Sequence, residues 1–435
     1  MAHRYQAPRG TRDLLPGEIE RWQRVEADAR EVLARYCYDE IRTPVFEDYE
    51  LFARSSGESS EVVQKEMYRF KDQGDRDLAL RPEGTASVCR AYLEHGFASR
   101  GRLHRLWYTG PMFRYARPQK GRYRQFWQLG AEIIGTAAPG ADIEMISLFV
   151  DLFDAWGFED LVVALNSVGT PDTRRAYGEQ LREWLAPAAG LLSADSQERL
   201  TRNPLRVLDT KNPTDLGVLA GKQGGLDPDK MPHMLDALDA EARGHFDAVR
   251  AGLEAMEIPH EIDHGLVRGL DYYTRTAFEV HDRSLGAQSA LGGGGRYDGL
   301  IEELGGPATP AVGFSIGLDR VVLAMEGRGD AAPRKPGLIY VASTEATRAA
   351  APAIVRALRS VYAVDHDLEA RSLNAQMRSA DRSGVRVVMI LGEEEWKKGE
   401  VVLKDLRNGS QRTANLDDMV EAIDDILDSD AQEQE

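Results

Sequence analysis

The sequence predicts a mixed α+β protein with two domains, the first of which contains a helical insertion. Strand-like and helix-like segments intermingle over residues 1–325, a helical, charge-mixed region occupies about 171–256 within them, and strands and helices alternate from residue 338 onward. Such alternation is typical of an α/β domain. With 435 residues, 42% of them hydrophobic, the chain is long enough for two or three domains with large cores.

The first domain is expected to open with a helix over 17–36, where apolar residues recur at helical spacing. Two aromatic and aliphatic segments, 106–114 and 125–135, flank the polar loop YARPQKGRYR and predict a hairpin with a basic tip. The other expected elements are a strand IRTPVFE, a helix from 142 to 156, a strand LVVALNS, strand patterns from 258 to 280, and a strand AVGFSIG followed by the helix LDRVVLAME.

A linker is expected at residues 326–337, which are rich in Gly, Pro and charge, and a second domain at 338–428. Asn408-Gly409 predicts a two-residue hairpin turn there, and residues 429–435 predict a disordered acidic tail. The other predicted elements of this domain are a strand LIYVAS, a helix over 345–362, a short strand, a helix over 373–382, and a strand VRVVMILG.

Positive charge is concentrated in one part of an acidic chain. The formal net charge is -17, yet no Asp or Glu occurs from His95 to Ala131. Because the whole molecule does not attract polyanions, a phosphate-rich partner has to be bound by a local patch. A solvated surface is the alternative for such a run. The eight basic residues of this segment are Arg100, Arg102, Arg105, Arg114, Arg117, Lys120, Arg122 and Arg124.

The sequence gives no sign of a membrane or secreted protein. No apolar run reaches the roughly 18 residues that span a bilayer, and the N-terminus MAHRYQAPRG lacks the apolar region of a signal peptide. Cys37 and Cys89 have no metal-like spacing, which argues against a disulfide framework. We therefore expect a soluble, cytoplasmic protein.

Several polar residues predict a ligand site. On the strand 125–135, Gln128, Gly130 and Glu132 share one face, opposite Trp127, and the glycine leaves room for a ligand or marks a bulge. Arg320 lies in the first turn of a helix, where a cation opposes the helix dipole and favours a bound anion or an ion pair with a neighbour such as Asp319.

A second arginine, Arg114, lies at the entrance of the hairpin, so the two arginines are a candidate clamp for nucleotide phosphates. Glu83 and Thr85 lie at a strand-to-helix junction, where helix capping is the simpler explanation for either residue.

Two further motifs have simpler readings. LGGGGRYDGL, residues 291–300, matches neither a Walker loop nor a dinucleotide fingerprint and is interpreted as a flexible turn. HEIDH, residues 260–264, matches the HExxH zinc pattern, which works on a helix. Its surroundings are strand-like and Pro259 precedes it, so we expect no zinc site and no metal held by the protein alone.

From residue 8 to about 424, these segments in this order resemble the histidyl-tRNA synthetases, which are class II aminoacyl-tRNA synthetases. GPMFRYARPQKGRYRQFWQLGAEIIG is similar to motif 2, AVGFSIGLDRV to motif 3, and the region around IRTPVFED to the dimer-forming motif 1. GLVRGLDYYTRTAFEV and LGGGGRYDGL are similar to the two histidine-specific boxes of that family.

The resemblance implies a class II catalytic core, in which an antiparallel sheet is flanked by helices, an insertion that contacts the tRNA acceptor arm, and a C-terminal α/β anticodon-binding domain. It also implies a homodimer that uses ATP with Mg²⁺, activates L-histidine as histidyl-adenylate, and transfers it to histidine tRNA.

Roles for individual residues also follow from the resemblance. Arg268 would be catalytic, neutralising charge between the histidine carboxylate and the α-phosphate, and Arg114 would hold that phosphate. Arg320 would hold ATP at its other end, with Glu132 also in the ATP set. The α-amino group of histidine would be bound by Glu83, Thr85 and Gln128, and its imidazole by Glu132 and Tyr273. Arg268 would also contact histidine, and Tyr272 and Tyr297 would line its pocket. The acceptor end of the tRNA would meet Arg117, Gln119, Lys120 and Arg122.

Two related classes share such a core. The regulatory paralogue of ATP phosphoribosyltransferase does not charge tRNA and would normally lack both the three arginines 114, 268 and 320 and a tail like that after residue 337. Pseudo-enzyme sensors of uncharged tRNA usually lie inside much longer chains. The sequence therefore favours the synthetase.

Overall fold

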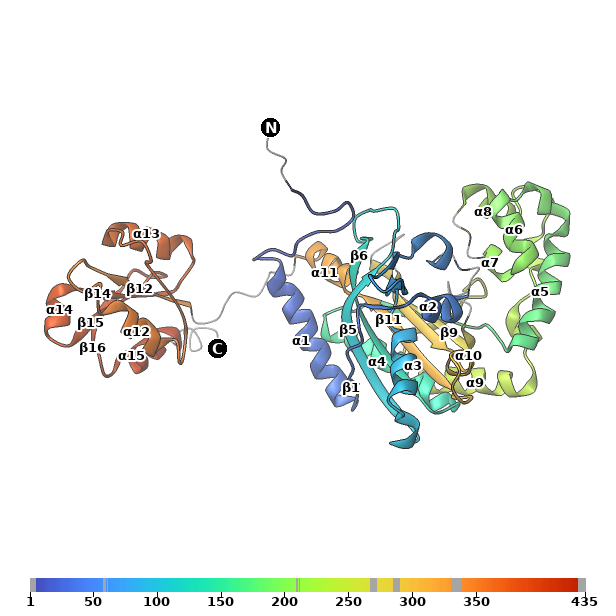
Figure 1. The fold of residues 1–435 in the computed structure, drawn as a ribbon, viewed down its shortest axis with the longest axis horizontal. Helices are drawn as coiled ribbons and strands as arrows, with labels where there is room; N and C mark the ends of the chain where they lie inside the picture. The colour runs from blue at the N-terminus through green and yellow to red at the C-terminus, as the bar shows by residue number, and fades with distance from the viewer. Residues whose placement is uncertain are drawn as a thin grey trace. The chain divides into compact units, whose positions relative to one another are not determined.

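The computed structural model describes residues 5–57, 60, 62–208, 210, 212–266, 272–284, 290–329 and 338–428. The chain divides into two compact units, Met1–Ala332 and Pro333–Glu435 (Figure 1). Each unit contains its own sheet and its own buried hydrophobic clusters. The two are therefore described separately.

A mostly antiparallel sheet forms the centre of the first unit, as the resemblance predicted. Within the described residues it has eight strands, and only its two edge pairs are parallel. The short strands β2 (Phe46–Asp48), β4 (Asp77–Leu80) and β3 (Arg69–Lys71) form a separate small sheet. In spatial order the large sheet consists of β1 (Asp39–Glu40), β5 (His104–Phe113), β6 (Gln125–Ile134), β11 (Ala311–Gly317), β10 (Ala290–Arg296), β9 (Thr274–Asp282), β7 (Leu161–Ser167) and β8 (His260–Ile262).

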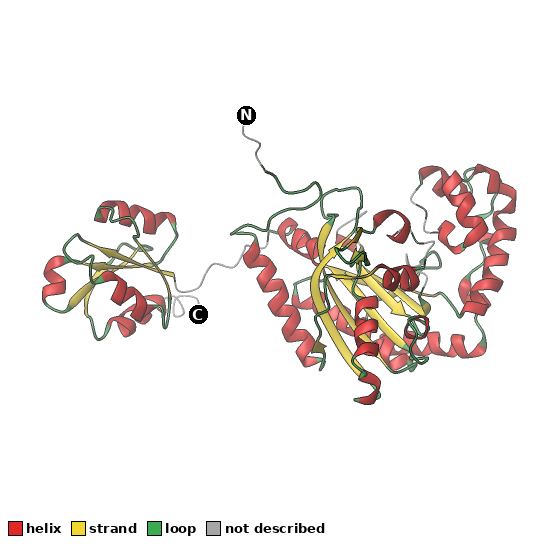
Figure 2. Cartoon of the chain, viewed as in Figure 1, coloured by secondary structure: helices red, strands yellow, loops and turns green. Residues whose placement is uncertain are grey.

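Helices cover both faces of this sheet (Figures 1 and 2). On one face α1 (Ile19–Arg35), α4 (Pro139–Ala155) and α11 (Leu318–Gly327) belong to the largest core cluster. On the other face α3 (Thr85–Glu94) and α10 (Leu300–Glu303) pack in a second cluster. The helix α2 (Tyr49–Ser56) lies between the small sheet's first two strands in sequence and packs against α3.

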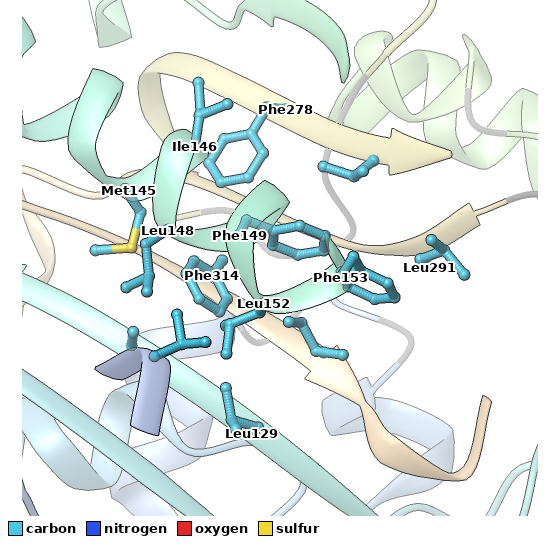
Figure 3. Packing of buried hydrophobic residues seen from close by; sticks show 14 of the residues in the cluster. Leu129, Met145, Ile146, Leu148, Phe149, Leu152, Phe153, Phe278, Leu291 and Phe314 are labelled. Carbon is cyan, nitrogen blue, oxygen red and sulfur yellow. The ribbon is translucent and has the colours of Figure 1, made fainter. Parts of the chain in front are cut away.

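The core beneath α4 is built from aromatic rings. Phe149 stacks on Phe153 with ring centroids 5.1 Å apart and meets Phe314 of the sheet edge-on at 5.0 Å (Figure 3). Burying each such side chain stabilises the fold by roughly 1.5–3 kcal/mol. The residues Leu129 and Ile133 of β6 also belong to this cluster, so the predicted alternation of β6 side chains between two faces is confirmed.

The region after β7 is helical and has its own small hydrophobic clusters (Figure 2). Several of its helices begin with a side-chain cap. Thr170 caps α5 by accepting from the Thr173 amide, and Asp239 caps α9 by accepting from the Ala242 amide. Its helices are α5 (Pro171–Leu185), α6 (Ala194–Arg202), α7 (Leu205–Leu208), α8 (Pro213–Leu219) and α9 (Ala240–Ala255).

The second unit is an α/β domain with a five-stranded sheet in the order β13-β12-β14-β15-β16. The predicted helix over 345–362 is shorter, because residues 345–350 form turns before α12 begins. The strands are β12 (Leu338–Ser343), β13 (Ala363–His366), β14 (Val387–Leu391), β15 (Glu400–Asp405) and β16 (Gln411–Asn415), and the helices are α12 (Ala351–Leu358), α13 (Leu373–Arg382), α14 (Glu393–Lys397) and α15 (Met419–Asp428).

The predicted two-residue turn at Asn408-Gly409 is wrong. A type I′ turn needs positive φ at both central residues, but of these two only Gly409 has it, at 76°. The amide of Asp405 instead donates to the Ser410 carbonyl at 3.0 Å, and Gly409 donates back to Asp405 at 2.9 Å, closing a wider loop. The Asp405 carboxylate, which accepts from the Arg407 amide at 2.8 Å, stabilises this loop.

The glycine-rich segment is a central strand, so its interpretation as a flexible turn is wrong. Gly292 and Gly294 lie in β10, paired on both sides with β11 and β9. A Cβ atom on Gly294 would lie 2.0 Å from the Gly313 carbonyl oxygen, which explains why a residue without a side chain occurs here. Glycine disfavours strands intrinsically, and the two neighbouring strands override that preference.

The HEIDH segment is not helical. His260 begins strand β8, while His264 lies beyond its end, stacked on His233 with ring centroids 3.7 Å apart. The prediction of a strand is confirmed, and the helical spacing required by a zinc protease is excluded. Of the two cysteines, Cys37 is exposed, Cys89 is buried, and both are free thiols. No helix among the described residues is long and apolar enough to cross a membrane.

Candidate functional site

The hairpin of β5 and β6 brings polar residues onto one face of the sheet. In the register of this pair Tyr108 lies opposite Gly130, and Gly110 opposite Gln128. On the other side of β6, Gly313 of β11 pairs with Glu132. A Cβ atom on Gly130 would lie 2.3 Å from the Tyr108 ring, so glycine there leaves room for the tyrosine. The space beside Gly130, which was predicted to leave room for a ligand, is therefore filled by the Tyr108 side chain.

A cavity of about 180 Å³ opens over this face. Residues far apart in sequence meet in its wall, because α3 and β9 begin beside it, β10 ends beside it, and the middle of β6 crosses it. Val62, Gly313, Phe314 and Ser315 complete the wall. The cavity brings together these predicted site residues: Glu83, Thr85, Arg114, Gln128, Tyr272, Tyr273 and Tyr297.

A second cavity of about 260 Å³ shares Arg114, Gln128 and Ser315 with the first, so the two lie side by side. Arg320 contributes to its wall, and so does Arg122 of the hairpin loop. Together the cavities provide room for a small molecule next to a larger ligand, with Arg114 between them.

The floor of the first cavity offers free hydrogen-bonding capacity. Gln128 is 7% exposed, and its buried Oε1 has no hydrogen-bond partner among the residues that the structure describes. A buried amide oxygen without a partner costs about 1–3 kcal/mol, which a donor on a bound ligand would recover. Glu83 caps α3 as predicted, accepting from the amides of Thr85 at 2.5 Å and Ala86 at 3.0 Å. Burial raises the pKa of Glu83 despite these bonds.

Glu132 lies behind the cavity wall. It is fully buried and accepts hydrogen bonds from the hydroxyl groups of Tyr297 at 2.5 Å, Thr85 at 2.8 Å and Tyr108 at 3.3 Å. Loss of solvation raises the pKa of Glu132 to about 8, and the three hydroxyl donors limit this rise. Glu132 is not one of the described residues that line either cavity.

The two predicted phosphate-binding arginines lie in different parts of the site. Arg114 is half-buried, and its Nε donates to the Pro82 carbonyl at 2.8 Å, which aims the rest of its guanidinium into the cavities. Burial lowers the pKa of Arg114. Arg320 is exposed and its Nη1 donates to the Ala290 carbonyl at 2.9 Å. The alternative of an ion pair with Asp319 is not seen, since Asp319 accepts from the Trp127 amide and pairs with Arg12 at 3.5 Å.

The hairpin loop carries its basic side chains at the mouth of the site. Arg117, Gln119 and Lys120 are exposed. The backbones of Gln119 and Arg122 bond to each other, which turns the loop, and Arg122 pairs with Glu66 at 3.0 Å. This leaves the tip of the basic loop solvent-accessible beside the larger cavity.

Two residues of the site, Tyr108 and Gly313, were not predicted from the sequence. Tyr108 and Gly313 touch the Glu132 carboxylate, and neither carries a motif signal. Pairing of β5 and β11 with β6 places them there, and this register was not predicted. Arg268, the predicted catalytic residue, lies outside the described residues.

A family model described as "Histidyl-tRNA synthetase" matches residues 10–321, and one described as "Anticodon binding domain" matches 336–426. The chain belongs to the histidyl-tRNA synthetase family. Among its relatives are proteins named histidine–tRNA ligase. The one from Synechococcus sp. is 50% identical, covering 96% of this chain and 98% of that protein, and the one from Desulforamulus reducens is 46% identical, covering 95% and 97%.

Solved histidyl-tRNA synthetase structures have the same fold. The apo enzyme of S. aureus superposes with a TM-score of 0.79 at 34% identity, covering 97% of this chain and all of that one. A Bacillus halodurans protein, titled ATP phosphoribosyltransferase regulatory subunit/histidyl-tRNA synthetase, gives 0.64 at 23% identity, covering 90% and 99%. At that identity the likeness shows the fold alone, so the family's ligases at 46–50% are the stronger guide to function.

Proposed function

We propose that this chain activates L-histidine with ATP and transfers it to the 3′ end of histidine tRNA. The observation that supports this best is the convergence of seven candidate residues on one small cavity, in a chain half identical over nearly its full length to histidine–tRNA ligases. A regulatory paralogue that only binds histidine is not favoured, because the ligases match this chain at high identity and coverage.

In the first step the carboxylate of histidine attacks the α-phosphorus of ATP, and pyrophosphate leaves with its bonding electrons. In the second step a ribose hydroxyl of the terminal tRNA nucleotide attacks the activated carbonyl, and AMP leaves. Arg114, between the two cavities, would hold the α-phosphate, and Arg320 would hold ATP at the far end of the larger one. Arg268 would neutralise the charge that builds up between carboxylate and phosphate.

Histidine would occupy the smaller cavity. Its α-amino group is a donor and matches Glu83, Thr85 and the unpartnered Oε1 of Gln128. Glu132 and Tyr273 would bind the two imidazole nitrogens, with Tyr272 and Tyr297 as lining. A protonated carboxyl group has one O–H donor besides its acceptor positions. Because the pKa of Glu132 is raised to about 8, its O–H would donate to an imidazole nitrogen while its oxygens accept from the three hydroxyl groups.

Mg²⁺ would enter with the ATP phosphates. This ion is commonly held by one or two carboxylates together with substrate phosphates. Glu279 of β9 lines the larger cavity, as Arg320 does, and would supply such a carboxylate. The ion would neutralise phosphate charge when bound.

The acceptor end of the tRNA would meet Arg117, Gln119, Lys120 and Arg122 at the tip of the hairpin loop. Their exposed, basic surface supports this placement on an otherwise acidic protein. The protein would act in the cytoplasm, where tRNA charging takes place.

We also propose a homodimer formed through the motif 1 region. Phe46 of β2 and Phe70 of β3 are exposed, with ring centroids 6.4 Å apart, and Val45 beside them is exposed as well. Such an apolar patch is a feature of interfaces. Sedimentation equilibrium should give twice the monomer mass, and Phe46→Asp with Phe70→Asp should shift it toward the monomer.

The decisive experiment is pyrophosphate exchange into ATP with each of the twenty amino acids. Exchange with histidine alone is expected. A folded sample that binds histidine yet catalyses no exchange would favour the regulatory class instead.

The catalytic role of Arg268 has its own test. Arg268→Ala should keep the fold and histidine binding but slow adenylate formation about 100-fold or more, which corresponds to roughly 2.7 kcal/mol. Arg283→Ala is the control, because Arg283 is exposed and paired only loosely with Glu261 at 3.5 Å. Unchanged single-turnover activation in Arg268→Ala would remove the assignment.

A further inference from the structure

The helical region 171–255 is attached to the sheet through α5 and α9, and the first attachment reaches the histidine cavity. Arg174, in the first turn of α5, donates Nη1 to the backbone carbonyl of Tyr273 at 2.5 Å. Tyr273 lines the cavity, with its ring tilted by 42° against that of Tyr272 and the centroids 4.7 Å apart. The first helix of the region is therefore hydrogen-bonded to the backbone of the cavity wall.

The second attachment reaches the same wall from α9 (Figure 1). Glu241, in the first turn of α9, accepts from Arg275 Nη2 at 2.6 Å, and Arg275 follows Tyr273 by two residues. The backbone of Arg275 has φ of 52°, a conformation that costs about 1–3 kcal/mol in a non-glycine residue. Two hydrogen bonds, to Gly169 and from Val168, hold it there. The strained backbone fixes the direction in which the guanidinium points.

A buried charge cluster links α9 to the other side of the cavity. His245 Nε2 of α9 lies 3.3 Å from Asp142 Oδ2, which lies 3.6 Å from Arg296 Nε of β10. Asp142 and Arg296 are fully buried, and neither oxygen of Asp142 has a hydrogen-bond partner among the described residues. Removing one member would leave a buried charge uncompensated. Arg296 immediately precedes Tyr297, whose hydroxyl is bonded to Glu132.

We propose that Arg174 and Arg275 are positioning residues, through which the helical region 171–255 holds the wall of the histidine cavity and couples histidine binding to whatever that region binds. This inference rests on the proposed function and on the family resemblance, which implies that the helical region contacts the acceptor arm of the tRNA. Coupling of this kind is reciprocal, so tRNA would change the affinity for histidine by the same factor as histidine changes the affinity for tRNA.

Titration of purified protein with L-histidine tests the positioning role directly. Arg174→Ala should weaken histidine binding about tenfold, equivalent to about 1.4 kcal/mol. Glu241→Gln, at an exposed position, should weaken it severalfold by removing the charge that attracts Arg275 toward α9. Arg175→Ala is the matched control, one residue further along α5, since that arginine pairs with Asp172 on the surface. Equal histidine affinity in Arg174→Ala and Arg175→Ala would overturn the proposal.

A second readout separates positioning from general loosening of the fold. The histidine dissociation constant is measured with and without a saturating histidine tRNA transcript. In the wild-type protein the two values should differ, and in the double variant Arg174→Ala/Glu241→Gln the difference should vanish. A ratio that stays unchanged in the double variant would contradict coupling through these residues. The titrations without tRNA need no catalysis, so absent pyrophosphate exchange would count against the proposed function and leave the histidine-binding result interpretable.

Discussion

The hydrogen-bonding capacity of each buried polar side chain at the site depends on the donors around it. Among the described residues, three hydroxyl groups and no cation lie within hydrogen-bonding distance of the Glu132 carboxyl group. Gln128 is buried with an acceptor left over. The hydroxyl donors orient the carboxyl group of Glu132. The free Oε1 of Gln128 needs an N–H donor, which a ligand would provide. Such a site discriminates strongly against analogues that cannot hydrogen-bond.

The raised pKa of Glu132 predicts that the stability of the wild-type protein, compared with Glu132→Gln, depends on pH. The folded protein holds this proton up to about pH 8, whereas the unfolded chain releases it near 4.5, the ordinary pKa of a glutamate. The native state therefore binds more protons between these values, and the contribution of Glu132 to the free energy of unfolding falls as pH rises through that window. Glu132→Gln, which cannot ionise, should gain melting temperature relative to wild type from pH 5 to pH 9.

Thermal unfolding of both proteins across this range is the measurement. Glu144→Gln, on a half-buried carboxylate that pairs with Arg105 at 2.6 Å, is a suitable comparison because its partner is a cation. A difference between wild type and Glu132→Gln that is the same at every pH would contradict the assignment.

At the scale of elements, the strands around the site depend on close packing that only glycine allows. β10 and β11 approach each other through Gly294 and Gly313, and β11 approaches the Glu132 side chain through Gly313. A Cβ on Gly313 would lie 1.6 Å from Glu132 Oε2. The position of the carboxylate is thus set by the strand beside it.

Gly313→Ala should therefore destabilise the first unit by more than about 1 kcal/mol and weaken histidine binding, because overpacking forces Glu132 to move. Gly217→Ala in α8 is the counterpart, since a Cβ there meets no atom within 4 Å. That change should be neutral or stabilising by up to about 1 kcal/mol. Melting temperature and histidine titration check both. Comparable effects of the two substitutions would argue against packing as the cause.

The β5–β6 loop predicts a salt-dependent contribution to RNA binding. If Lys120 contacts a tRNA phosphate, Lys120→Ala should reduce the slope of log K against log[salt] by about 0.7–1. Lys71→Ala removes the same charge from a side chain already paired with Asp75 at 2.8 Å and should leave the slope unchanged. Filter binding of the tRNA between 50 and 200 mM salt, roughly the range in which such effects are large, measures the slopes. Equal slopes for the two variants would place the RNA elsewhere.

At the scale of the whole molecule, the candidate site and the segment similar to an anticodon binding domain belong to different units. Every predicted site residue that the structure describes lies in the first unit, and the segment similar to an anticodon binding domain lies in the second. A chain ending at residue 329 keeps both cavities and their hydrophobic cores. It should retain histidine-dependent pyrophosphate exchange within about threefold.

The same shortened chain should lose aminoacylation by about 100-fold in kcat/KM, roughly 2.7 kcal/mol of transition-state stabilisation, because RNA contacts are removed. Steady-state charging of tRNA and pyrophosphate exchange on one preparation supply both values. Parallel loss of the two activities would mean that the second unit also supports the catalytic site.

Local patterns in the sequence were sufficient for the regular elements. The helix expected over 17–36 is α1, Ile19–Arg35, and the strands expected at 106–114 and 125–135 are β5 and β6. The spacing of apolar residues can be read within a single segment, and it indicates which side chains of that segment face the core. Motif resemblance added the family, and with it most of the residues in the cavity wall.

Tertiary structure decided what those patterns do not encode. The glycines of 292–295 have no side chains to show a period, and strand pairing on both sides makes them a strand. Tyr108 and Gly313 reach Glu132 through strand register, and Arg174 reaches Tyr273 across 99 residues of chain. Contacts between distant segments depend on how complete elements pack together. The sequence by itself therefore determined most of the elements and the family, whereas the strand at 290–296, the shape of the candidate cavity and its attachment to the helical region came from tertiary packing.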